Sequence, residues 1–159
     1  MTGCEWITYE TSVLGLVVSA GARPDETTFL TAPAQTQQLG FIVYRAGEAV
    51  TAHEHRRVPR QIEQTTEVVL VRHGRCRVDF YRPDHSLHCS RELEAGDLVL
   101  LVEGGHGFHM HTDTTLLEIK QGPYTGAEDK VRFRTSDAAD AVPGTEPPRP
   151  AGTPNRADP

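Results

Sequence analysis

Several features that mark other protein classes are missing from this chain of 159 residues. No apolar run approaches the roughly 18 residues that a membrane span needs. The first residues include Glu5 and Glu10, so the basic start and apolar core of a signal peptide are also lacking. We therefore expect a cytoplasmic protein without a membrane partner.

Cysteine and clustered positive charge are both scarce. The three cysteines, Cys4, Cys76 and Cys89, form no CxxC pair, which argues against a disulfide framework and against a thiolate zinc site. With 16 basic and 22 acidic residues the net charge is -6, and no block of five to eight Lys or Arg occurs. The chain therefore lacks the basic patch that is typical of proteins that bind duplex nucleic acid, and we expect no nucleic-acid partner.

Apolar residues are also few, and their shortage is concentrated at one end. They make up 37% of the chain and aromatics 6%, against roughly 45–50% apolar (a count that includes Gly) in an average globular protein. Residues 136–159 hold six of the eleven prolines, and Val142 is their only large aliphatic side chain. We expect a disordered Pro-rich tail over 136–159 and a single β-barrel domain, with additional N-terminal strands, over 1–135.

The remaining residues alternate between apolar and polar in short runs separated by turn residues, which predicts an all-β fold with little room for helices. Many short antiparallel strands favour a closed jelly-roll barrel or a sandwich, because closure removes exposed strand edges. The expected strands are 5–9, 13–19, 28–31, 40–45, 50–56, 67–72, 75–81, 87–92, 98–102, 107–111 and 115–121.

Histidines gather in two places. His53 and His55 are two residues apart in an expected strand, so both imidazoles face one side and can share a metal ion. Glu67 begins an apolar strand, and a carboxylate that enters a barrel interior needs a cationic partner. The second group, His106 to His111, can supply a fourth ligand. A hydrogen-bonded cluster without metal is the alternative.

These residues give the chain a resemblance to the single-domain cupins. The first cupin motif is matched by Gly47, five residues, His53-Glu54-His55, a gap of eleven residues, Glu67, six residues and Gly74. In the second motif Gly96 and Gly104 keep the family spacing, Val102 replaces a proline, and His106 comes one residue early.

The resemblance implies a double-stranded β-helix, the cupin jelly-roll barrel, with His53, His55, Glu67 and His106 as metal ligands. Fe(II) is favoured, with Mn, Ni, Cu or Zn as other candidates. In this register His109 and His111 point outward as surface or rim residues; a one-residue slip would reverse the faces.

The expected function is a mononuclear Fe(II)/O₂ oxidoreductase of the dioxygenase type acting on a small molecule, with Glu67 as a ligand or a catalytic base. One alternative is a redox-neutral metal-dependent isomerase, epimerase or lyase, and another is a non-catalytic binding or sensing module. We also expect a C₂ homodimer.

Two surface features complete the expectations. The segment 56–66 lacks alternation and includes Pro59, so it is expected as a loop at the barrel mouth or as an edge extension. It begins with Arg56-Arg57-Val58-Pro59-Arg60, which could hold an anionic substrate or simply be solvated. In the last strand, Glu118 and Lys120 are expected on an exposed face, opposite Leu117 and Ile119.

Overall fold

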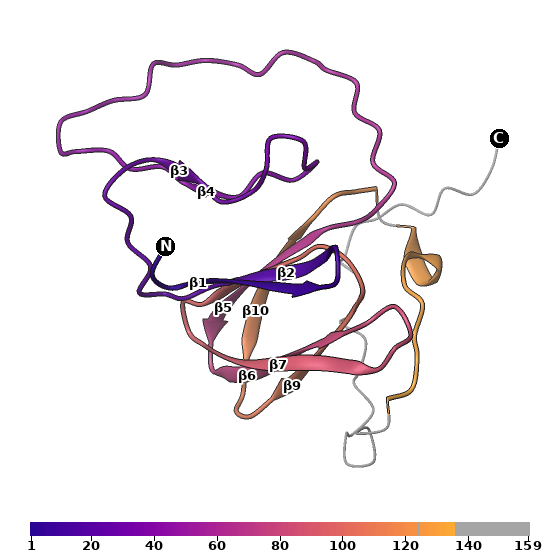
Figure 1. Ribbon diagram of the computed structural model, residues 1–159. Helices are drawn as coiled ribbons and strands as arrows, with labels where there is room; N and C mark the ends of the chain where they lie inside the picture. Colours follow the sequence, from indigo (N-terminus) through magenta and orange to yellow (C-terminus); the bar gives the residue numbers. More distant parts are fainter. Residues whose placement is uncertain (124, 136–159) are drawn as a thin grey trace.

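A computed structural model describes residues 1–123 and 125–135 of this protein, which form two main antiparallel sheets (Figure 1). The larger sheet has the order β1 (Cys4–Tyr9), β2 (Ser12–Val18), β8 (Leu98–Leu101), β5 (Glu67–His73) and β10 (Thr115–Lys120). The smaller has the order β7 (Leu87–Glu94), β6 (Arg75–Tyr81) and β9 (Gly105–Met110). The all-β prediction is confirmed for these residues, whose only helix is the short 3₁₀ turn η1 (Gly126–Asp129). The expected tail over 136–159 lies outside them.

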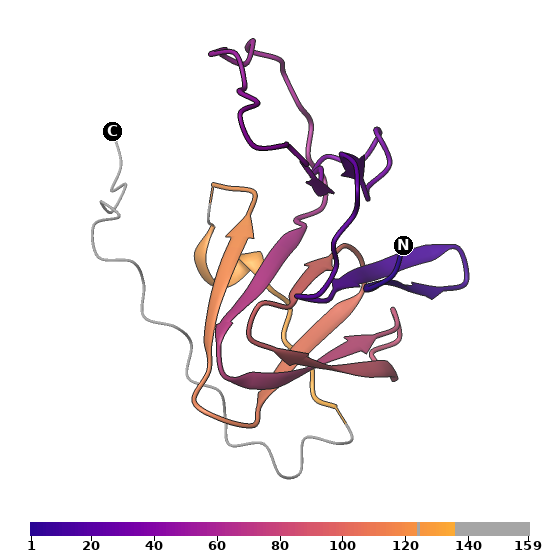
Figure 2. The same ribbon diagram turned by 90° about the vertical axis from the view of Figure 1, so that its left-hand side faces the viewer.

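The two sheets pack face to face around one apolar core (Figure 2). Strand β6 shows why the sequence folds this way: its alternate residues Cys76, Val78 and Phe80 are fully buried. Apolar side chains from β1, β2, β5, β7 and β8 meet them from the other strands: Ile7, Leu14, Val69, Val71, Leu93, Val99 and Leu101. Burial of these side chains is the main force that holds the sheets together.

A second, smaller core covers the outer face of the larger sheet. Leu16, Val18, Val68 and Leu100 form it, and Leu30, Leu39 and Phe41 pack against them. These last residues belong to the excursion between β2 and β5, which includes the short hairpin β3 (Thr28–Phe29) and β4 (Gly40–Phe41). The strands expected over 28–31 and 40–45 are therefore present only as these two-residue pairs.

The segment 42–66 contains no strand, so the strand expected over 50–56 is wrong. Figures 1 and 2 show this segment as a long loop that runs away from both sheets. A strand needs the hydrogen bonds of a neighbouring edge, and here the alternating pattern finds none; Ile42, Tyr44 and Val50 stay exposed. Strands β9 and β10 are consequently edges, and the described residues do not close into a barrel. The loop expected over 56–66 is confirmed.

Gly74 forms the tight turn between β5 and β6. Its φ of +85° lies in the left-handed region, and a Cβ there would stand 2.3 Å from the carbonyl oxygen of Asp113. Glycine is the residue that accepts this backbone and this close approach. The turn takes the chain from β5 in the larger sheet to β6 in the smaller sheet, on the other side of the core.

No helix within residues 1–123 and 125–135 has the length and apolar character to cross a bilayer.

Candidate active site at Glu67 and His106

Glu67 is the first residue of β5, and its side chain faces the interior between the sheets. It has the same parity along the strand as the core residues Val69 and Val71, and it is only 7% exposed. A carboxylate in this position loses most of its water and must be compensated by donors or cations. The sequence prediction that Glu67 enters the interior is confirmed.

His106 supplies the nearest of these groups. It lies opposite Phe80 in the β6–β9 pairing, whereas His109 lies opposite Arg77 on the other face. Its Nε2 atom is 3.3 Å from Oε2 of Glu67. The predicted register, with His106 inward and His109 outward, is therefore confirmed, and the one-residue slip is excluded.

Both lysines of the chain also face Glu67, which sequence reasoning missed. Lys130 Nζ is 3.6 Å and Lys120 Nζ is 3.8 Å from Oε1 of Glu67. Lys120 also lies 3.2 Å from a carboxylate oxygen of Glu118 and 3.2 Å from one of Asp129. The expectation that Lys120 belongs to an exposed face is wrong.

The reversed face of β10 has a local cause. The pairing with β5 shifts between Thr115 and Leu116, and such an irregularity changes which residues point inward. Leu117 and Ile119 are left 46% and 55% exposed on the outer side. Sequence alternation gives the period of a strand but does not fix which set of residues is buried.

The surroundings of Glu67 keep it ionised. The hydrogen bond from His106 lowers the pKa of Glu67 most, burial opposes it, and the charges of His106, Lys130 and Lys120 lower the pKa further. Burial acts to lower the pKa of Lys120, but its hydrogen bonds to Glu118 and Asp129, together with the negative charges of Glu118 and Glu67, raise the pKa overall. The site therefore holds a carboxylate facing two ammonium groups and an imidazole.

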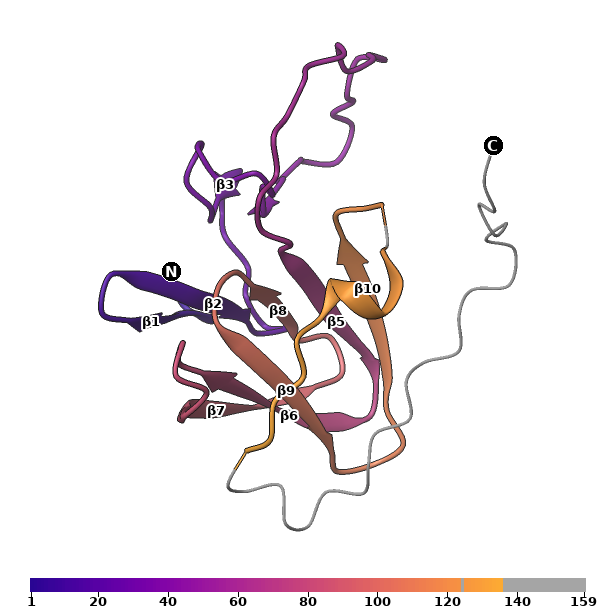
Figure 3. The same ribbon diagram turned by 90° about the vertical axis from the view of Figure 1, so that its right-hand side faces the viewer.

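Glu67 and His106 line a cavity of about 830 Å³. One wall is aromatic: Phe133 stacks on His85 with ring centroids 4.0 Å apart and meets Tyr81 edge to face at 5.3 Å. Figure 3 shows the stretch after η1 running across β9, and this stretch brings Lys130 and Phe133 to the cavity. Gly105 allows the approach, because a Cβ there would lie 2.5 Å from the ring of Phe133.

His53 and His55 do not join this site. Both are exposed in the segment 42–66, with ring centroids 5.4 Å apart, and neither lines the cavity. His53 Nδ1 instead lies 2.9 Å from the carbonyl oxygen of Thr51. Of the four ligands expected from the sequence, the structure brings Glu67 and His106 together and leaves the other two apart.

The arrangement consequently does not fit the expected four-ligand metal centre. Among the described residues, no three side chains of His, Cys, Asp or Glu are placed so that they could hold a metal ion. The ammonium groups of Lys120 and Lys130 lie next to the Oε1 atom of Glu67. As described, the site is suited to hydrogen bonding and proton transfer.

One signal in the sequence could have found the lysines. Of 16 basic residues only Lys120 and Lys130 are lysines, and both follow the motif that supplies His106. Their contact with Glu67 depends on strand pairing, which residue spacing alone does not give.

Comparison with protein-family models finds no match, and comparisons with curated proteins and with solved structures find none either.

Proposed function

We propose that this protein is an enzyme of the cupin type that performs redox-neutral acid–base chemistry on a small molecule at Glu67 and His106. One observation carries the proposal: a buried carboxylate lies 3.3 Å from an imidazole that lines a cavity large enough for a small molecule. Isomerisation, epimerisation and elimination are the reactions that such a pair can catalyse.

The division of labour follows from the contact. In this proposal the reactive form of His106 is the neutral imidazole whose Nε2–H faces Glu67, 3.3 Å away, and whose lone pair is on Nδ1. Nδ1 takes a proton from a substrate carbon next to a carbonyl. The proton returns to a neighbouring carbon in isomerisation, to the opposite face of the same carbon in epimerisation, or to the leaving group in elimination. Glu67 remains ionised and stabilises the imidazolium formed between these two steps.

Lys130 has a complementary role at the cavity. Its ammonium group lines the cavity and is 3.6 Å from Glu67. From there it can donate a hydrogen bond to the substrate oxygen on which negative charge develops when the proton leaves. His106, which acts first as the base and then as the acid, and Lys130, which stabilises the developing charge, then both lie beside the buried carboxylate of Glu67.

A second candidate is the Fe(II)/O₂ oxidoreductase of the dioxygenase type, with the double-stranded β-helix that the cupin resemblance implies. The observation in its favour is that Glu67 and His106, two of its four expected ligands, are in contact. The segment with His53 and His55 ends directly before Glu67, and β9 and β10 have open edges. Pairing of residues 42–66 with those edges would close the barrel. Fe(II) is the favoured ion, and it would supply oxygen chemistry when bound by the completed set.

One experiment separates these candidates. The protein is incubated in D₂O with a panel of 2-keto acids, 2-hydroxy acids and aldoses, and C–H to C–D exchange is followed by NMR. Acid–base chemistry predicts exchange that His106→Asn and Glu67→Gln abolish and that His73→Asn, at an exposed position at the end of β5, leaves intact. A parallel sample with added Fe(II) is followed for oxygen uptake.

Each result selects a different function. Oxygen uptake that depends on iron and is lost in His53→Ala would favour the second candidate over the first. Saturable binding with neither exchange nor uptake would replace both with a binding or sensing module.

The proposal keeps the cytoplasmic location and the C₂ homodimer expected from the sequence. Light scattering that gives a strict monomer at micromolar concentration would contradict the dimer.

A further inference from the structure

The outer face of the smaller sheet carries a second group of histidines, independent of the cavity. His109 pairs with Arg77, which is on the outer face of the sheet, so His109 points away from the core. His106 and Phe108 pair with the buried residues Phe80 and Val78. His111 follows two residues later and has the same parity as His109. His109 in β9 and His111 in the bend that follows this strand therefore form a His-X-His pair on the outer surface.

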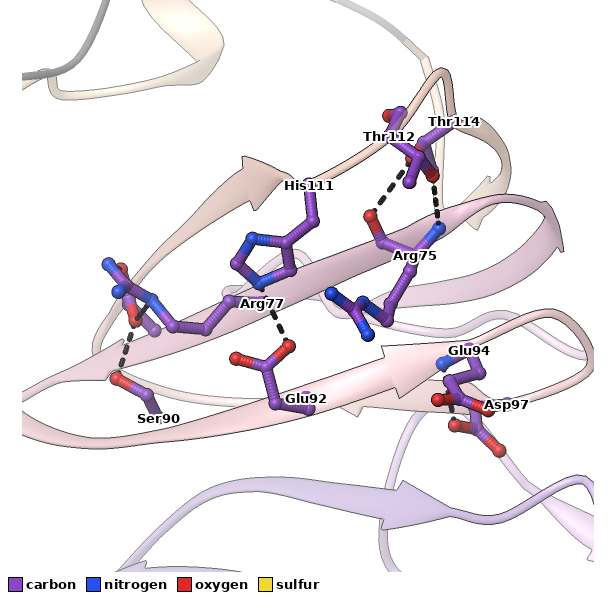
Figure 4. A network of polar contacts seen from close by, with 10 residues as sticks. Arg75, Arg77, Ser90, Glu92, Glu94, Asp97, His111, Thr112 and Thr114 are labelled. Atoms are coloured by element: carbon purple, nitrogen blue, oxygen red, sulfur yellow. Dashed lines mark hydrogen bonds and ion pairs between the residues drawn. The ribbon is translucent and has the colours of Figure 1, made fainter.

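The rings of this pair are close together, and a carboxylate lies beside them. The ring centroids of His109 and His111 are 5.4 Å apart. His111 Nε2 is 2.8 Å from Oε2 of Glu92 on β7, as Figure 4 shows. Metal–nitrogen bonds of about 2.0–2.1 Å place two imidazole centroids roughly 5 Å apart around a tetrahedral ion. The observed spacing thus allows both rings to bind one ion after small rotations.

The neighbouring charges favour a cation on this face. Arg77 is held by Asp79, with Nε 2.8 Å and the Nη2 atom 3.0 Å from its two carboxylate oxygens. The register places Glu92 opposite Arg77 and Glu94 opposite Arg75. Three carboxylates therefore share this face with two guanidinium groups, which leaves a net charge of -1. Because Asp79 pairs with Arg77, the negative charge on this face lies mainly at Glu92 and Glu94.

We propose that His109, His111 and Glu92 form a surface binding site for a borderline divalent cation such as Zn²⁺. Two imidazoles and a carboxylate are a ligand set that Zn²⁺ accepts, with water in the remaining position. In the described residues no three such side chains are placed so that they could hold a metal ion, so the proposed site requires Glu92 and the two rings to move. The Glu92 side chain is 59% exposed and so is free to turn toward the two rings. The contact with His111 that it leaves involves an exposed carboxylate, and surface contacts of this kind contribute little stability.

The test measures Zn²⁺ binding to the full-length protein by isothermal titration calorimetry. We expect one site that becomes at least about tenfold weaker in His109→Asn and in His111→Asn, because each variant removes one of two nitrogen ligands. Glu92→Gln is expected to weaken the same site, by about tenfold or less. X-ray absorption of the zinc-loaded protein should show nitrogen and oxygen ligands without sulfur.

Matched variants of the other histidines identify the site. His53→Asn/His55→Asn removes the second His-X-His pair, and His106→Asn removes the cavity imidazole; both are expected to retain the site. Unchanged Zn²⁺ binding in His109→Asn/His111→Asn, loss of the site in His53→Asn/His55→Asn, or no Zn²⁺ binding by the parent protein would each overturn the proposal. Since all substituted residues of the cluster are on the surface, urea denaturation should show the variants to be as stable as the parent.

Discussion

Replacing Glu67 by Gln removes the carboxylate from the candidate active site while it keeps the size of the side chain and one carbonyl oxygen. His106 loses a charged acceptor at 3.3 Å, and Lys120 and Lys130 lose a partner at 3.8 Å and 3.6 Å. A hydrogen bond to a charged group contributes about 1.5–3 kcal/mol, and each partly exposed ion pair about 0–1 kcal/mol. Because Gln retains part of the hydrogen bonding, we expect the free energy of unfolding to fall by about 2 kcal/mol at pH 7.

The pH dependence gives the sharper test of this reasoning. The pKa of Glu67 is lowered in the folded protein, below an unfolded value of about 4.3. The stabilisation from the carboxylate is therefore fully present above the unfolded pKa and is lost as the pH falls through the folded pKa. Gln does not titrate, so the difference between the parent and Glu67→Gln should shrink toward zero in acid.

Urea denaturation of both proteins at several pH values between 7 and 3 measures this difference. Glu118→Gln is the matched control: Glu118 also contacts Lys120, but its side chain is 41% exposed, and the loss is expected to stay within about 0.5 kcal/mol. A Glu67→Gln loss of the same size at pH 7 and pH 3 would refute the argument, since it would show that packing rather than charge makes the contribution.

Three further substitutions test the fold. Phe80→Ala empties the centre of the core, where Phe80 is 0% exposed, and should cost about 3–5 kcal/mol in chemical denaturation; a loss under 1 kcal/mol would contradict the described packing. Gly74→Ala forces a Cβ to within 2.3 Å of the Asp113 carbonyl oxygen at a φ of +85° and should lower stability by about 1–3 kcal/mol, so an unchanged midpoint would argue against this turn. Leu117→Thr alters an exposed side chain on β10 and should change stability by no more than about 0.5 kcal/mol. A loss above 2 kcal/mol would mean that Leu117 is buried and that the face of β10 is the opposite one.

Much of the fold was predictable because its cause is local. Alternation with a period of two predicted the strands that became β5 to β10, since apolar residues at every second position make one face of an extended chain apolar. The buried set Cys76, Val78 and Phe80 follows directly from this pattern. The inward direction of His106 follows from the same parity, because Phe108 has the same face.

The strand expected over 50–56 shows where local pattern fails. It has apolar residues only at Val50 and Ala52, followed by four polar residues, and the segment has no neighbouring strand and no regular structure. Pairing is a property of two segments together, so a period of two in one segment is not sufficient for it. For the same reason the sequence pattern predicted that His53 and His55 join Glu67, whereas the structure leaves them apart.

The sequence by itself determined the all-β class, the chemistry of the available side chains and the two faces of most strands, because these depend on composition and on neighbours along the chain. Only the tertiary structure decided that Lys120 and Lys130 meet Glu67 and that His111 meets Glu92. It also decided that an irregular pairing at Thr115 turns Leu117 outward. These contacts join residues that are far apart in the sequence. They depend on sheet register and on the path of the segments after β9 and η1, which are fixed when the whole core is buried.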